Sequence, residues 1–548
     1  MIHEPKDASV RSEKAFTCFD YLTFTVLTVL VSGAIVHFMA QWLANADWAR
    51  SQIALWGLTL LCIGKLASIQ LRWWYLPFMK RPKPMAVRSG WKVGVATTFV
   101  PGEEPIEMLE QTVRALIDLE YPHETWVLDE GNDIRVKALC AELGAFHFSR
   151  KNYPHYQTRD GVFQARSKHG NYNAWLHEVG FKKYDVITAF DPDHVPQAAF
   201  LFEVLGYFND PDVGYVQAPQ AYYNQEASFI ARGAAEETYG YYSATQMFGY
   251  SMGYPIVTGC HSTHRVTALK EVGGFPAHDA EDLLITLLYR SAGWRGVYVP
   301  KILARGLTPV DWGGYIKQQL RWSRSVLDIK FRIYSRIAGT LPVKERVTSF
   351  MHGLFYLQPM VVVAGLVLLA YMLITGSVPP SALNHSVIGA FCLLVATLVF
   401  CEFFRQRFYL DRRNEWGWHW RAGLLQLAKW PYFLLAVYQV LSDRRFPYVL
   451  TSKVKAPADT YILWPHVLVA ELLVLAWIVG ALKDGSLHPL LHIWAAGAAI
   501  GSLLVALTEL MSFPDPYDPT LLTRDAPSSL KTDELRDVNA HYPAQRAS

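Results

Sequence analysis

Two carboxylates separated by one residue, Asp191 and Asp193, directly follow an apolar stretch over residues 185–190. If that stretch is a β-strand, both side chains lie at its carboxyl end, about 7 Å apart along the backbone. Paired carboxylate oxygens suit Mg²⁺ or Mn²⁺, and an ion of this kind usually brings a phosphate with it. An Asx turn is the structural alternative, because Asp and Pro both favour turns.

Two further segments combine polar side chains with glycine. Asp129 ends another apolar stretch and precedes a Glu-Gly pair, so the chain can turn sharply and the carboxylate can accept hydrogen bonds from a ribose or base. Lys168 offers a compact cation, Gly170 lets the backbone approach a ligand, and Asn173 could cap a helix starting at Ala174. An ordinary loop and an ordinary helix start are the structural alternatives.

Two later segments bring acids and a mixed polar and aromatic face. Residues 278–282 open an expected helix whose positive dipole end favours ionised carboxylates, and Asp282 could take a proton there from a sugar hydroxyl. Gln318, Arg321 and Trp322 share one helix face, which suits hydrogen bonding, clamping of a diphosphate and stacking on a sugar. Helix capping and an interfacial helix with Trp and Arg anchors are the respective alternatives.

The composition indicates a soluble domain combined with membrane segments. The 548 residues exceed one compact domain, and 51% of them are hydrophobic. The mean hydropathy of +0.11 is nevertheless low for a chain that lies wholly in lipid. A net charge of +3 gives no indication of a nucleic-acid partner. The 6 cysteines form no C-x-x-C pair and no metal-ligand spacing, as in a reduced, cytosol-facing protein.

Short β-type runs alternate with amphipathic runs between about residues 91 and 334. Strands are expected over 92–99, 124–129, 145–148 and 185–190, and helices over 105–119 and 134–143. Such alternation predicts an α/β domain with a mostly parallel, Rossmann-like sheet that binds ligands at the carboxyl ends of its strands. Asp129 and Asp191 both sit at such ends, which favours one common site.

Apolar runs on both sides of this domain are long enough to span a bilayer, and we expect about six spans. They cover residues 21–41, 53–71, 349–375, 386–404, 462–482 and 488–511. Cationic loops after the second and fourth runs mark the cytoplasmic side, which places both termini in the cytoplasm. Residues 422–441 contain Lys429 and Pro431 and have basic groups at both ends, so we expect an interfacial or re-entrant helix there.

In this order, the polar segments resemble the signature of the family 2 glycosyltransferases, specifically the processive membrane-embedded synthases. That signature consists of a first Asp, a KAGNxN-like stretch, DxD, TED and QxxRW. The matching positions here are Asp129, residues 168–173, Asp191, Asp193, Glu281, Asp282, Gln318, Arg321 and Trp322. The Asp-His-Val-Pro after the DxD is similar to the cellulose synthase branch, and residues 447–453 resemble its FxVTxK gating loop.

The resemblance implies an inverting, metal-dependent transferase that polymerises a UDP-sugar into a β-linked polysaccharide and translocates it. The nucleotide-sugar would contact Asp129, Glu104, Lys168, Asp191 and Arg321. Asp191 and Asp193 would hold Mg²⁺ or Mn²⁺, and Asp282, beside Glu281, would be the general base.

The resemblance also implies positions for the acceptor and for a gate. The acceptor would contact Gln318, Trp322 and Cys260, the last because residues 259–262 are loosely similar to the family's Phe-Cys-Gly-Ser segment. Thr451 and Lys453 would belong to the gating loop.

The implied architecture is an α/β GT-A (Rossmann-like) cytosolic domain inserted in an α-helical transmembrane domain of about six spans with interfacial helices. Its parts are a cytosolic N-terminal tail (1–20), a transmembrane hairpin (21–85), the GT-A domain (86–335), a C-terminal transmembrane region (336–512) with an interfacial helix (415–443) and a gating-like loop (444–456), and a disordered tail (513–548). The expected partners are the UDP-sugar, the growing polysaccharide and the lipid bilayer, with no nucleic acid. A bacterial inner membrane suits this plan; a periplasmic export partner and the oligomeric state stay open.

The sequence departs from the family pattern at several positions, and these leave the donor sugar open. Ala280 replaces the Thr of TED, the usual Asn-Glu is missing from residues 98–105, and the residues after Gln318 are more similar to hyaluronan or chitin-oligosaccharide synthases. UDP-glucose and a β-glucan are the first hypothesis, and a GlcNAc-containing polymer is the alternative. A non-processive transferase with a lipid-linked acceptor is the nearest rival. A transporter with a regulatory domain fits poorly, because the sequence has no internal repeat.

Overall fold

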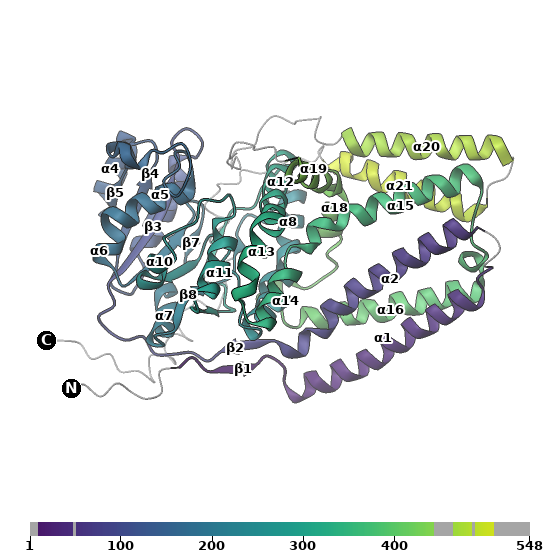
Figure 1. The fold of residues 1–548 in the computed structure, drawn as a ribbon, viewed down its shortest axis with the longest axis horizontal. Coiled ribbons are helices and arrows are strands. Elements are labelled where there is room, and N and C mark those ends of the chain that lie inside the picture. The colour runs from purple at the N-terminus through teal and green to yellow at the C-terminus, as the bar shows by residue number, and fades with distance from the viewer. Residues whose placement is uncertain (1–8, 48–50, 443–463, 485–487, 509–548) are drawn as a thin grey trace.

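The computed structural model describes residues 9–47, 51–442, 464–484 and 488–508. It has an α/β domain at one end and long helices at the other, as Figure 1 shows. Between these two parts lie α8 (Phe229–Gly240), α12 (Trp312–Asp328) and α18 (Trp420–Ala428), which connect the α/β domain to the long helices.

The α/β domain is built on a seven-stranded mixed sheet with strand order β11-β8-β10-β6-β3-β4-β5. Its strands are β3 (Val93–Phe99), β4 (Glu124–Asp129), β5 (Phe146–Phe148), β6 (Val186–Phe190), β8 (Val213–Gln217), β10 (Ser262–Arg265) and β11 (Arg295–Tyr298). Neighbouring strands are parallel except at β10, which runs antiparallel to both β6 and β8. The prediction of a mostly parallel α/β sheet is therefore confirmed.

Helices cover both faces of this sheet, which explains why β6 is buried along its whole length. Val127 of β4 packs in one cluster with α3 (Ile106–Ile117) and α4 (Ile134–Leu143). The next residue, Leu128, points to the opposite face and packs in a cluster with α5 (Lys168–Trp175) and α11 (Glu281–Ser291). The predicted strands and helices of this half of the domain all form, within two residues of the expected bounds.

Two small sheets attach other segments to the domain. β7 (Val195–Pro196) directly follows the Asp191 turn and pairs with β12 (Ala304–Gly306), which in turn pairs with β9 (Ala221–Tyr222). β1 (Ser12–Lys14) pairs with β2 (Lys80–Pro82), so the segment before the first long helix is bound to the segment after the second.

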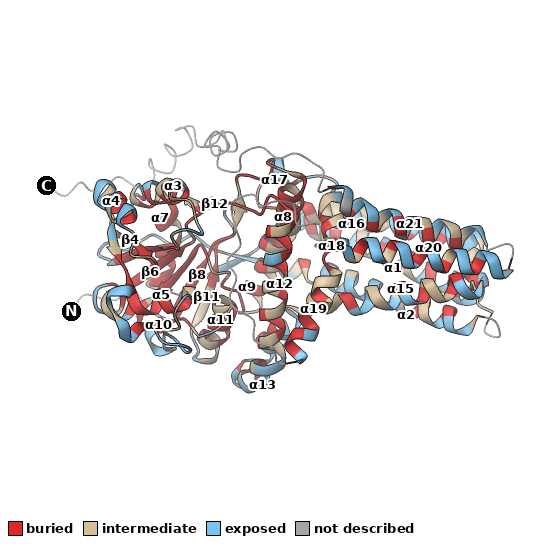
Figure 2. Ribbon diagram, turned by 90° about the horizontal axis from the view of Figure 1, so that it is seen from above, coloured by how far each residue is buried: buried red, intermediate tan, exposed pale blue. Residues whose placement is uncertain are grey.

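Among the described residues, five helical segments are long and apolar enough to cross a membrane: Cys18–Ala44, Gln52–Phe78, Val343–Thr375, His385–Gln406 and Trp464–Lys483. Large apolar side chains are exposed along them, for example Val29 and Val36 on α1 (Cys18–Ala44), and Figure 2 shows their exposed outer faces. Such surfaces are stable in lipid rather than in water. The chain is an integral membrane protein, and the first five predicted spans are confirmed as membrane-length helices.

The last two helical segments differ from simple spans. α21 (Pro489–Leu507) lies at the position of the sixth predicted span. Its apolar part, Pro489–Val505, is shorter than the five membrane-length helices. α18 is followed by α19 (Trp430–Leu441) with a bend of 42° at Lys429. That bend agrees with a re-entrant helix and also with a broken span, so both readings of residues 422–441 stay open.

Candidate active site

Side chains from separate segments meet at the carboxyl end of β6. The ammonium of Lys168, at the start of α5, lies 2.5 Å from Oδ1 of Asp191 and 3.9 Å from Oε1 of Glu281. Gly259 lies against the same cluster, because a Cβ there would be 3.2 Å from Oδ2 of Asp282 and 3.7 Å from Nζ of Lys168. The structure thus brings together the lysine, the DxD and the paired acids that the sequence predicted separately.

The helix that carries Lys168 starts earlier than predicted. Ser167 is the N-cap of α5, and its hydroxyl accepts a hydrogen bond from the backbone N–H of Gly170 at 3.1 Å. The predicted cap at Asn173 is wrong, because a capping serine precedes it and leaves it inside the helix. Asn173 instead exchanges two 2.8 Å hydrogen bonds with the backbone of Phe275, which fixes α5 to the segment before α11.

Asp129 and Glu104 shape the turns at the same edge of the sheet. The Asp129 carboxylate is fully buried and accepts hydrogen bonds from the N–H groups of Gly131 and Asp133 at 2.8 and 2.6 Å. Oε2 of Glu104 accepts one from the N–H of Val100 at 2.8 Å. These contacts fix Asp129 at the end of β4 and Glu104 in the turn after β3, which lies between β4 and β6. Their predicted contacts with a nucleotide stay predictions.

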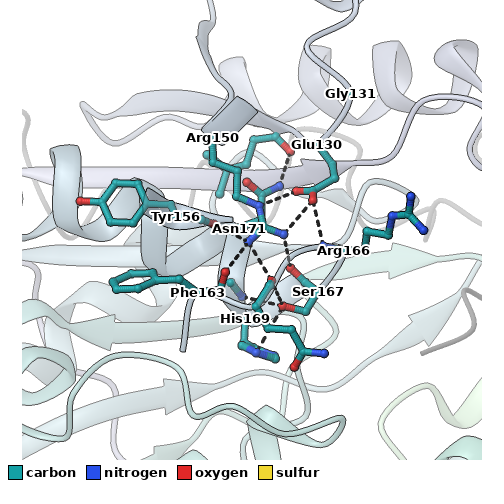
Figure 3. A network of polar contacts seen from close by, with 12 residues as sticks. Glu130, Gly131, Arg150, Tyr156, Phe163, Arg166, Ser167, His169 and Asn171 are labelled. Atoms are coloured by element: carbon teal, nitrogen blue, oxygen red, sulfur yellow. Dashed lines mark hydrogen bonds and ion pairs between the residues drawn. The ribbon is translucent and has the colours of Figure 1, made fainter. Parts of the chain in front are cut away.

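A buried arginine that the sequence reasoning missed holds the loop before Lys168. Figure 3 shows the Arg150 guanidinium in contact with both carboxylate oxygens of Glu130, at 2.7 and 2.8 Å. It also donates to the carbonyl oxygens of Gln164, at 2.9 Å, and Ser167, at 3.3 Å. Arg150 therefore fixes the chain after Asp129 to the chain that leads into Lys168. The sequence gives no signal that distinguishes Arg150 from the other arginines in polar loops.

The DxD turn has the donor set of a divalent metal site. Asp191, Asp193 and His194 each offer a ligand atom, and these atoms lie within 4.8 Å of one another. Carboxylate oxygens with one imidazole suit Mn²⁺ or Mg²⁺, so the residues fit the expected ion. Although burial opposes ionisation, Lys168 and His194 keep the pKa of Asp191 below its usual value. The sequence reasoning did not predict that His194 would join the two aspartates.

Cys260, predicted to contact the acceptor, lies beneath this turn and is fully buried. Its sulfur accepts a hydrogen bond from the backbone N–H of Asp191 at 3.2 Å. The thiol therefore supports the DxD turn, and its contact with an acceptor stays a prediction.

The paired acids at the start of α11 have environments that favour proton transfer. Burial, together with the charge of Asp282, raises the pKa of Glu281 to about 7 although Lys168 opposes the shift. Burial also raises the pKa of Asp282, although its Oδ1 accepts the N–H of Leu283 at 2.7 Å. A carboxylate whose pKa is raised toward neutrality is a better general base than an ordinary one.

The helix with the predicted acceptor residues is joined to the acidic segment. Nε2 of His278 lies 3.2 Å from Asp328, and Arg324 donates to Asp279 at 2.7 Å. Both partners belong to α12, on which Gln318, Arg321 and Trp322 are partly exposed. The two segments are therefore held next to each other. Thr451 and Lys453 of the predicted gating loop lie outside the described residues.

Comparison with known proteins indicates the family of the α/β domain. Residues 99–325 match the family described as "Glycosyltransferase like family 2". The catalytic subunit of cellulose synthase (UDP-forming) from Xanthomonas axonopodis pv. citri (strain 306) is 26% identical over 309 residues, which cover 54% of this chain and 40% of the relative. Cellulose synthase 2 of Novacetimonas hansenii is 23% identical over 447 residues, which cover 78% of this chain and 26% of the relative.

The chain thus matches less than half the length of these relatives. Among solved structures, a mannosyltransferase from Pyrobaculum calidifontis in complex with GDP-Man and Mn²⁺ is similar with a TM-score of 0.48 and 16% identity, covering 72% of this chain and 99% of that one. Residues 99–325 therefore form a family 2 glycosyltransferase domain, and the chain is similar to cellulose synthases over part of their length.

Proposed function

We propose that this protein is an inverting, processive transferase that builds a β-linked polysaccharide from a UDP-sugar and passes it across the membrane. The observation that carries the proposal is the convergence of Lys168, Asp191 and the acids Glu281 and Asp282 on one point at the sheet edge. UDP-glucose is the favoured donor, because the curated relatives are cellulose synthases. The catalytic domain would face the cytoplasm of a bacterial cell.

The donor would bind across the carboxyl ends of β4 and β6. Asp129 would hold the nucleoside, and Lys168 and Arg321 would bind the diphosphate oxygens as cations. Mg²⁺ or Mn²⁺ held by Asp191 and Asp193 would supply charge neutralisation for the departing diphosphate. Because Lys168 is already paired with Asp191, the two groups keep each other charged in a partly buried site.

Asp282 would accept the proton of the acceptor hydroxyl as the hydroxyl oxygen forms its bond to the anomeric carbon. The bond from that carbon to the diphosphate breaks at the same time, with its electrons remaining on the diphosphate. Attack from the opposite face turns the α-linked donor into a β-linked product. Glu281, which lies 3.9 Å from Lys168, would stay next to the base and influence the pKa of Asp282 through its own charge.

The acceptor would lie against α12, with its sugar ring on the face of Trp322. This helix packs closely against α19, which is joined to α18 through the bend at Lys429. The helix that would hold the growing end is therefore attached directly to the membrane part of the protein. That arrangement supports transfer of the product into the membrane region after each addition.

The test is UDP release by the purified full chain with UDP-glucose, UDP-GlcNAc, UDP-galactose and UDP-glucuronate, in the presence of Mg²⁺ or Mn²⁺. We expect release with UDP-glucose, loss of release in Asp282→Asn, and normal release in the control Asp118→Asn, an exposed acid at the end of α3. If UDP is released only with UDP-GlcNAc, the proposed product is a GlcNAc polymer and not a β-glucan. A product with a single added sugar would refute processivity.

A further inference from the structure

Three side chains that favour soft metal ions meet beneath the DxD turn. His194, Cys260 and His261 each offer one ligand atom, and these atoms all lie within 4.8 Å of one another. Their exposed fractions are 4%, 0% and 0%. A thiol sulfur with two imidazole nitrogens is a donor set that proteins use for Zn²⁺, whereas Mg²⁺ prefers oxygen ligands.

The hydrogen bonds of His261 leave one of its ring nitrogens unused. Nδ1 lies 2.9 Å from the carbonyl oxygen of Pro219, so this nitrogen carries the proton and donates it. Nε2 then holds a lone pair, and it is buried without a hydrogen-bond partner among the described residues. Metal-binding histidines have this arrangement, because a carbonyl on one nitrogen fixes the tautomer that exposes the other to the ion.

The other two members of the cluster contact the DxD turn. His194 lies beside His261, with ring centroids 4.8 Å apart, and its side chain interacts with the Cys260 thiol. Its Nδ1 lies 3.3 Å from the Asp193 carboxylate. The sulfur of Cys260 accepts the N–H of Asp191, a contact that stabilises a thiolate.

His261 reaches this place at a conformational cost. Its φ is +58°, in the left-handed region that residues other than glycine seldom adopt. The strained backbone lies between Cys260 and the first residue of β10, and it directs a histidine into the protein interior next to the end of β6.

We propose that His194, Cys260 and His261 bind a Zn²⁺ ion that fixes the DxD turn to the start of β10. Such an ion would be a structural bond between neighbouring antiparallel strands, and it would share His194 with the oxygen-rich group of Asp191 and Asp193. It would hold the two aspartates in place for the proposed reaction. The site itself does not rest on that reaction, because metal content is measured without substrate.

The first test is the zinc content of the full chain, purified in detergent, loaded with Zn²⁺ and dialysed into Mg²⁺. We expect about one zinc per chain to remain. Replacement by Co²⁺ should give the sulfur-to-cobalt absorption band. A wild-type protein that keeps no zinc and gives no sulfur-to-cobalt band would overturn the proposal, whatever the variants do.

Variants then assign the ligands. Cys260→Ser and His261→Asn should each lower the retained zinc by about tenfold or more and remove the sulfur-to-cobalt band. Cys140→Ser is the matched control, because Cys140 on α4 is also a buried thiol but belongs to a different core cluster. Zinc that is kept in Cys260→Ser but lost in Asp193→Asn would place the ion at the aspartates and refute the assignment.

Discussion

Replacing Arg150 by methionine removes a cation that is completely buried and leaves the carboxylate of Glu130 without its partner. The two side chains are joined through two charge-assisted bonds of 2.7 and 2.8 Å, and the Glu130 side chain is only 15% exposed. Breaking a buried pair from one side costs about 3–5 kcal/mol. Because every 1.4 kcal/mol is a factor of about ten, local opening of the loop before Lys168 should become about 10²- to 10⁴-fold more frequent.

Hydrogen exchange of the backbone amides between residues 158 and 168 measures this opening in the detergent-solubilised protein. Arg150→Met should increase the exchange rate of these amides by about 10²- to 10⁴-fold. The added change Glu130→Gln should restore part of the protection, because no unpaired charge then remains. Arg135→Met is the control, since Arg135 forms an exposed pair with Asp133. Equal exchange in Arg150→Met and Arg135→Met would show that the buried pair does not hold the loop.

Further predictions concern the acids, the glycine beside them and the membrane part. The pKa of Asp282 is raised, so this base is protonated at a higher pH than an ordinary aspartate, and UDP release should fall as the pH drops. Because the charge of Lys168 lowers the pKa of Asp282, Lys168→Gln should move this fall to higher pH. A pH profile that Lys168→Gln leaves unchanged would contradict the coupling. Gly259→Ala, which adds a Cβ 3.2 Å from the Asp282 carboxylate at a φ of +78°, should lower turnover about 10- to 100-fold while the protein stays folded in circular dichroism. Lys429→Met removes the cation of Glu237 at a site where the two side chains are 4% and 9% exposed, so thermal inactivation should be faster. The exchange Lys429→Glu with Glu237→Lys should recover part of the loss.

The sequence predicted those features that depend on periodicity along the chain. The buried run at residues 185–190 and the alternation around Asp129 are local patterns, and both became strands of one sheet that pair with β3 from its two sides. The long apolar helices followed from length and composition in the same way. The position of Lys168 next to Asp191 could be expected once both were assigned to the same sheet edge.

The remaining features depend on contacts between segments that are far apart in the sequence. The N-cap of α5 was assigned to Asn173 because its bond to Phe275, 102 residues away, cannot be inferred from local preference. Arg150 was missed because its four carbonyl contacts and its ion pair exist only in the folded loop. The cysteine spacing excluded a metal site within one segment, whereas His194 and Cys260 are brought together by strand pairing.

The most direct test of the proposed reaction is the rate of UDP release from UDP-glucose by the wild-type protein and by Asp282→Asn, with donor affinity measured in both. If Asp282 is the general base, the variant should bind the donor normally and release UDP about 10²- to 10⁴-fold more slowly. Equal release rates in the two proteins would contradict the assignment of Asp282 and the mechanism built on it.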